Sequence, residues 1–324
     1  MKVYNLPRIV HPLYVLVTGV LGIAIVVYMY VGTFPYPNDS AGKSIAETPS
    51  FVIWVFLIAI LFSFLTIVAL PAWIVFFRLF KYISNENHIQ SRKLIVTLII
   101  LTVLLFFLVP AFLFLPHKEN IHYIPDLHFP QAPGIGARFI IIYVYTFLVL
   151  LPVGLGITLV NTIAEFMTAK IPDVIQSEEK LFEFISDYLE YRNLLQTYLI
   201  VLGVVAGLNP LITAAYGAIG VDLGLFTKEN LPEGLIIVYG LLLTLILIFI
   251  FAPAYYNLSN VGKRLRDSVY PMNSLDKVKD TMTKRDELDN LLQNKVSLTG
   301  NIISGALSLS PLITSVLASL FQMK

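Results

Sequence analysis

The sequence contains no cysteine, and charged residues make up only 13% of its 324 residues. The absence of cysteine excludes disulfides, thiolate metal sites and cysteine catalysis. The share of charged residues is about half of the roughly 25% that is usual in soluble domains. It accompanies a hydrophobic share of 57% and a mean hydropathy of +0.78. A water-exposed globular protein of this length would not tolerate such a composition, so we expect an integral membrane protein.

Asp, Glu, Lys and Arg are also missing from six long stretches of the chain. About 20 apolar residues, rising about 1.5 Å each, cover the hydrocarbon core of a bilayer. A charge at the bilayer centre costs at least about 2.5–3.5 kcal/mol, and none is placed there in this chain. We therefore predict an all-α polytopic membrane protein with six spans, at about 12–34, 51–77, 94–116, 139–164, 195–219 and 234–257.

The Lys and Arg residues between the spans predict the orientation. Only Lys43, Lys118, Arg138 and Lys228 fall on one side of the six-span arrangement, and the other 18 of the 22 basic residues fall on the opposite side. Cytoplasmic loops collect Lys and Arg. We therefore expect a multi-pass protein of the plasma (inner) membrane whose N-terminus and charged tail are cytoplasmic.

The chain divides into a six-span transmembrane domain (1–262), a charged cytoplasmic segment (263–295) and an uncharged C-terminal helix (296–324). At 100° per residue the polar side chains of the C-terminal helix form one stripe. Interfacial helices usually carry Lys or Arg on the polar face, and this stripe has none. It favours contact with other helices or with a narrow aqueous path, and the helix is then a seventh crossing, a re-entrant helix or a helix in the interface. The stripe includes Ser304, Ser308, Ser315 and Ser319.

Small residues recur at steps of three and four along the fifth span and form one face of that helix. Its first two glycines make a GxxxG motif, which lets two helix backbones approach closely. This face indicates packing within the chain, a subunit interface or a pore wall. Its residues are Gly203, Gly207, Pro210, Ala214 and Gly217.

Prolines interrupt the fourth and fifth spans. Pro152 is followed by Gly154 and Gly156, and Asn209 precedes Pro210. Proline removes a backbone hydrogen bond and kinks a helix, and a broken helix can expose carbonyl groups to an ion or substrate. The sequence therefore predicts a hinge at 152–156 and names Asn209 as a candidate polar contact, although most transmembrane prolines only kink a helix.

Two further groups of residues are candidates for binding. His117, His122, Asp126 and His128 crowd the loop after the third span. Imidazole and carboxylate bind zinc or copper, but their spacing matches no known site, so we expect a solvated loop and neither a metal nor a cofactor. At the cytoplasmic mouth of the fourth span, Asn161 and Glu165 lie one turn apart and could bind a cation, or Glu165 is an ordinary terminal charge.

The stretch 175–194 predicts an amphipathic cytoplasmic helix that leads into the fifth span. Ser177 can cap it, and the following acidic residues complement its positive end. Its acidic face (Glu183, Asp187, Glu190) could meet the basic residues after the sixth span. Such a helix either transmits movement to the fifth span or lies as an elbow at the membrane surface.

The sequence contains no GxSxG, HExxH, Walker A or GxGxxG motif, so we name no catalytic residue and expect no enzyme.

The leading hypothesis is an oligomeric channel for ion transport, or a pore-forming effector, gated through cytoplasmic segments. The alternatives are a non-transporting scaffold, sensor or regulatory subunit, including one of a bacterial defence system, and a secondary transporter of a neutral or hydrophobic solute. The expected partners are the lipid bilayer, further copies of the chain, and a cytoplasmic protein or small-molecule trigger at 263–295. The net charge of +1 gives no reason to expect nucleic acid.

Overall fold

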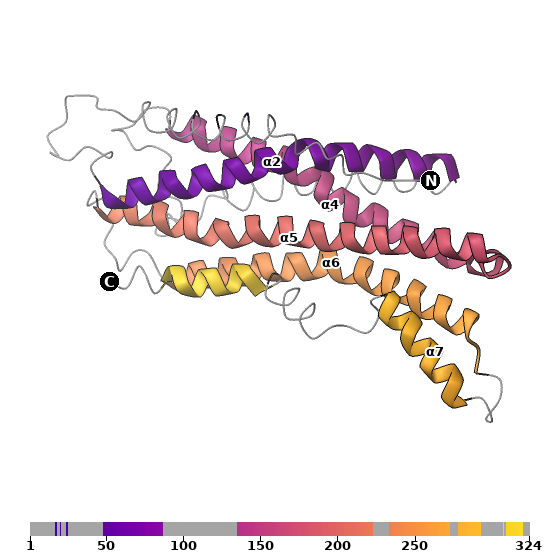
Figure 1. Ribbon diagram of the computed structural model, residues 1–324. Coiled ribbons are helices and arrows are strands. Elements are labelled where there is room, and N and C mark those ends of the chain that lie inside the picture. Colours follow the sequence, from indigo (N-terminus) through magenta and orange to yellow (C-terminus); the bar gives the residue numbers. More distant parts are fainter. Residues whose placement is uncertain are drawn as a thin grey trace, which may run out of the picture.

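The structure is a computed structural model that describes residues 48–86, 135–222, 233–272, 278–292, 307 and 309–319, with Val17, Val20 and Ala24. These residues are almost entirely helical, and no strand occurs among them. Figure 1 shows the long helices side by side, with a further helix at one end of the bundle and a short helix beside its other half. They are α2 (Pro49–Glu86), α4 (Ile135–Val174), α5 (Glu178–Asp222), α6 (Glu233–Val269), α7 (Val278–Leu291) and the C-terminal helix (Leu309–Ser319).

The four long helices, α2, α4, α5 and α6, are each long and apolar enough to cross a membrane. They contain the predicted spans 51–77, 139–164, 195–219 and 234–257. The chain is a helical membrane protein. The predicted spans 12–34 and 94–116 lie outside the described residues, apart from three helical positions in the first, so the count of six stays a prediction.

Each long helix has 37 to 45 residues, which is more than a bilayer requires. At about 1.5 Å per residue, such helices are about 55–68 Å long, roughly twice the hydrocarbon thickness. Their charged residues gather where α2, α4 and α6 end and where α5 begins, the same end of the bundle at which α7 lies (Figure 1). We call this part the charged end: 78–86, 165–174, 178–192 and 262–292 as far as described.

Two boundaries differ from the sequence prediction. Residues 175–177 form the turn between α4 and α5, so the predicted amphipathic helix begins at Glu178 rather than at 175. It then continues into the fifth span without a break, as one helix. Residues 263–269, which were predicted to begin the charged segment, are the last turns of α6.

Large apolar side chains fill the interior of the described bundle. One buried cluster joins α2, α4, α5 and α6 toward the charged end and includes Ile163, Leu195 and Val261. A second cluster lies between α2, α4 and α5 near the opposite end and includes Trp54. The outward face of α6 is apolar and exposed, up to 75% at Phe249. Such a face suits lipid or another apolar helix.

Candidate functional site at the charged end and on α5

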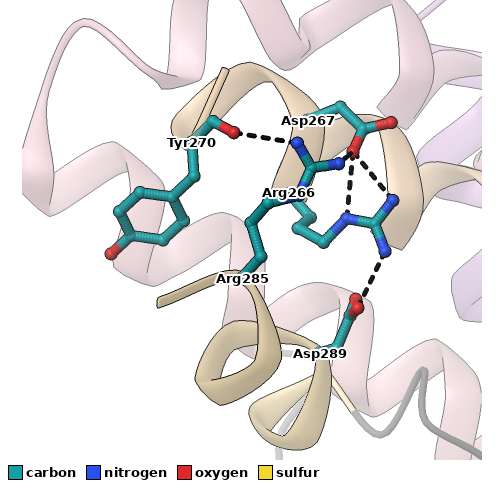
Figure 2. Close-up of polar contacts among 5 residues, drawn as sticks. All are labelled: Arg266, Asp267, Tyr270, Arg285 and Asp289. Carbon is teal, nitrogen blue, oxygen red and sulfur yellow. Dashed lines mark hydrogen bonds and ion pairs between the residues drawn. The ribbon is translucent and has the colours of Figure 1, made fainter. Parts of the chain in front are cut away.

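A network of ion pairs holds α7 against the end of α6 (Figure 2). Arg266 on α6 donates a 2.8 Å hydrogen bond to the Asp289 carboxylate on α7, and it also donates to the neighbouring Asp267. Arg285 on α7 donates to the same Asp267 carboxylate and, at 3.1 Å, to the main-chain oxygen of Tyr270. The Asp289 side chain is buried. We call these contacts the α6–α7 ion network.

A buried arginine joins α5 to the same unit. Arg192 is only 6% exposed, and its Nη1 donates 3.1 Å hydrogen bonds to the Tyr188 hydroxyl and to the main-chain oxygen of Leu292. Leu292, the residue after α7, is fully buried. Helices α5, α6 and α7 are therefore joined at the charged end by charged hydrogen bonds as well as by apolar contact.

A cavity of about 740 Å³ lies between α2, α4 and α5 at the charged end. Two ammonium groups and two carboxylates line it, together with aromatic side chains. Lys170 on α4 donates a 3.3 Å hydrogen bond to the Tyr82 hydroxyl on α2, and its Nζ lies 5.7 Å from the centre of that ring. The charged residues and tyrosines that line it are Tyr82, Lys170, Lys180, Glu183, Asp187 and Tyr191.

The carboxylates of the cavity share one face of α5, one helical turn apart. Burial raises the pKa of the Asp187 carboxyl, the nearby charge of Glu183 raises this pKa further, and Lys170 lowers it. Burial and then the charge of Asp187 likewise raise the pKa of Glu190. These residues precede the apolar part of α5. The carboxyl groups of this face lie in partly dehydrated surroundings, where a nearby cationic group would stabilise their charged form.

The small-residue face of α5 lies against the C-terminal helix. A Cβ atom added at Gly203 would lie 2.9 Å from the main-chain oxygen of Leu307, and one at Gly207 would lie 3.3 Å from the Ser310 hydroxyl. This hydroxyl donates a 2.7 Å hydrogen bond to the Gly203 carbonyl. Pro210, Ala214 and Gly217 are also buried. The structure thus places an intrachain neighbour on this face, while the subunit-interface and pore-wall alternatives stay predictions.

The C-terminal helix turns its serines toward the bundle. Ser315 and Ser319 are buried, whereas the apolar side chains on the opposite face are 41–49% exposed. The Ser315 hydroxyl donates to the Leu312 carbonyl of its own helix, and Ser319 donates to Val316. Gly240 of α6 lies against Ser315 and Pro311, so α6 also approaches this helix closely. Ser304 and Ser308 lie outside the described residues.

The residues predicted for the cytoplasmic mouth have different surroundings. Asn161 on α4 accepts a 2.9 Å hydrogen bond from the Asn257 amide on α6, whereas Glu165, one turn later, is exposed. Asn209 on α5 donates to the Val205 carbonyl of its own helix at 3.1 Å. In the structure, Asn161 is thus a helix-packing contact, and Asn209 bonds to its own backbone.

The predicted hinge lies within a continuous helix. Pro152, Gly154 and Gly156 are all inside α4, and Pro210 is inside α5. A Cβ added at Gly156 would lie 2.6 Å from the Tyr198 ring, so this glycine makes room for an aromatic residue of α5. The candidate metal residues His117, His122, Asp126 and His128 fall outside the described part of the chain, within which no cluster of three metal-ligating side chains occurs.

Comparison with known proteins does not supply a function. No protein family, curated protein or solved structure matches this chain. The geometry of the described helices is therefore the basis for a functional proposal. Sequence reasoning did not identify Arg192, Asn257 and Asp289. Arg192 and Asn257 border the apolar runs of α5 and α6, whereas Asp289 lies in the polar helix α7, where no local pattern marks it.

Proposed function

We propose that this protein is an oligomeric membrane channel or pore-forming effector gated through its charged end. The main support is the uninterrupted 45-residue helix α5. Its first half lines the charged cavity and binds the end of α7 through Arg192. Its second half carries the small-residue face that contacts the C-terminal helix. A movement at the charged end can therefore reach the membrane part through one rigid element.

The proposed path runs between helices at a subunit boundary or along the small-residue face. The interior of the described bundle is filled by large apolar side chains such as Leu65, Leu159 and Leu195. Backbone groups, hydroxyls and dewetting can select and gate in a channel without buried charge. The polar face of the C-terminal helix supplies hydroxyls, and the glycines of α5 present a smooth surface along which that helix can shift.

An engineered disulfide tests the gating step in a chain that has no native cysteine. The Cβ position at Gly207 lies 3.4 Å from the Ser310 Cβ, close to the range of about 3.5–4.5 Å found in disulfides. We expect Gly207→Cys/Ser310→Cys, purified and reconstituted into liposomes, to conduct when reduced and to lose ion flux when oxidised. Oxidant should not change flux in the wild-type chain or in Gly154→Cys, whose site has open space.

Two results would refute this proposal. One is a wild-type chain that releases neither ions nor dye from liposomes at any membrane potential or after cleavage between α6 and α7. The other is a cross-linked variant that conducts as well as its reduced form, because the C-terminal helix would then have no part in gating.

A non-transporting sensor or regulatory subunit is the second candidate, and the filled bundle interior favours it. The exposed part of α7 would then bind a soluble partner. Co-purification of such a partner at a fixed stoichiometry, lost when the chain is cut at Pro271 and accompanied by no flux, would favour this function over the channel.

A further inference from the structure

We propose that the cavity at the charged end binds a zwitterionic phosphate ester, in which a phosphate group lies beside an ammonium group. The headgroup of a zwitterionic phospholipid has this chemistry, and so does the free headgroup ester. The inference names the trigger of the proposed channel and in this respect rests on the proposed function. Binding itself does not require that the protein conducts.

The charges of the cavity are balanced and divided between helices. One face of α5 carries four of the lining residues, which follow one another at steps of three, four and four. They are Lys180, Glu183, Asp187 and Tyr191. Lys170 faces the same cavity from α4. Two ammonium groups match a phosphate, for which lysine is a common point-charge ligand. Two carboxylates match a cation, and a ligand with a single charge would meet repulsion from one of the two pairs.

The carboxylates favour a bound cation more than two solvated acids would. Glu183 and Asp187 are one turn apart, and like charges at this spacing repel each other. Burial raises the pKa of Asp187, and the repulsion from Glu183 raises it further. An ammonium group between them relieves the repulsion, and the aromatic side chains of Tyr82 and Tyr191 also line the cavity.

The size and place of the cavity favour a lipid headgroup as the source. Its volume of about 740 Å³ lies within the range of about 300–1,000 Å³ that is typical of small-molecule sites. Arg78 and Glu165 are the first charges after the apolar parts of α2 and α4, and Tyr82 and Lys170 follow four and five residues later. That separation is about 6–8 Å along a helix, similar to the headgroup layer of about 5–8 Å on each side of a bilayer.

Binding is tested with the full chain in a maltoside detergent, which contains no phosphate. The probes are dihexanoyl phosphatidylethanolamine below its micellar concentration, O-phosphoethanolamine, inorganic phosphate and ethanolamine, each titrated while thermal unfolding is followed. The cavity variants are Lys170→Gln/Lys180→Gln and Glu183→Gln/Asp187→Asn. The matched control is Asp280→Asn/Lys284→Gln, which neutralises an exposed ion pair on α7, outside the cavity.

We expect the two zwitterionic probes to bind, and inorganic phosphate or ethanolamine alone to bind at least about tenfold more weakly. Each cavity variant should weaken binding of the zwitterionic probes at least about tenfold, the effect of about 1.4 kcal/mol, and the control should change it less than about twofold. Tighter binding of the short-chain lipid than of O-phosphoethanolamine assigns the site to a lipid headgroup, and equal binding assigns it to the free ester.

Absent binding of both zwitterionic probes, or equal binding by the wild type and by both cavity variants, overturns the inference. Circular dichroism and elution volume check that each variant is folded. The single change Lys180→Gln, at an exposed position, supplies the measurement if a double variant does not fold. Flux in liposomes is measured separately, so binding without flux refutes the channel alone, and flux without binding refutes this site alone.

Discussion

Two glycines in the membrane helices should respond oppositely to the same substitution. Gly154 in α4 and Gly240 in α6 both lie inside long helices. A Cβ atom at Gly154 meets nothing within 4 Å, whereas one at Gly240 would lie 2.4 Å from the Ser315 hydroxyl and 2.5 Å from the Pro311 carbonyl. Gly240→Ala should therefore push the C-terminal helix away from α6, and Gly154→Ala should fit without adjustment.

The magnitude follows from two opposing effects. Alanine is favoured over glycine inside a helix by about 0.8–1.0 kcal/mol, and this gain applies at both positions. At Gly240 the new methyl group meets main-chain as well as side-chain atoms, and overpacking of this kind costs about 1–3 kcal/mol. The helix-propensity gain cancels in the comparison. We therefore expect Gly240→Ala to be less stable than Gly154→Ala by about 1–3 kcal/mol.

The assay is reversible unfolding of the purified chain in mixed micelles, followed by circular dichroism. Ser315→Gly in the Gly240→Ala background should recover part of the loss, because it removes the Oγ and Cβ atoms that the new methyl group would meet. Equal stability of the two alanine variants would refute the close packing of the C-terminal helix against α6. So would a lack of any coupling between the changes at 240 and 315.

Three further changes test other contacts of the described helices. Asp289→Ala should destabilise the attachment of α7 by about 1–3 kcal/mol. This is less than the loss on breaking a fully buried ion pair, because Arg266 is 23% exposed and keeps its pair with Asp267. Amide hydrogen exchange in α7 should become faster, and unchanged exchange would contradict the α6–α7 ion network. Asn257→Ala should cost about 0.6–1.7 kcal/mol in micelle unfolding, with little added by Asn161→Ala in the same chain; fully additive losses would argue against their hydrogen bond. The pKa of Asp187 is raised in the folded state above its ordinary value of 3.8. The wild type should therefore lose stability as the pH rises from about 3.8 through the raised pKa. Asp187→Asn should remove this loss in pH-dependent unfolding, and an unchanged pH profile would count against the burial of this carboxyl.

The membrane helices were predictable because one physical cost dominates their composition. A charge in the bilayer centre is expensive, so the charge-free runs at 51–77, 139–164, 195–219 and 234–257 mark α2, α4, α5 and α6. The ends of these helices were less predictable. Beyond the membrane the chain changes from an apolar to an amphipathic pattern without any change of secondary structure, and α5 continues through residue 194 with no signal of a break.

The candidate site was predictable only where local spacing determines it. The stripe from Gly203 to Gly217 marks a packing face by its steps of three and four residues. Its neighbour, the C-terminal helix, is about 100 residues away along the chain, and no local pattern specifies that pairing. The same reason explains the ion network. From the sequence, the basic residues after the sixth span are predicted to meet the acidic face of α5. In the structure, Arg266 instead bonds to Asp267 and Asp289, which lie closer to it in sequence.

The hydrogen bonds of the C-terminal helix determine how it can move. Ser315 and Ser319 donate to carbonyls of their own helix, so these bonds persist when the helix shifts as a rigid unit. The bond from Ser310 to the Gly203 carbonyl joins two helices, and its loss would cost only about 0.5–1.5 kcal/mol. Because Gly203 and Gly207 have no side chains to interlock, resistance to sliding comes from backbone contact with α5, from the close approach of Gly240 on α6, and from the bond of Ser310. In the gating that we propose, a modest change of free energy at the charged end, transmitted by α5, would then be enough to change the position of this helix.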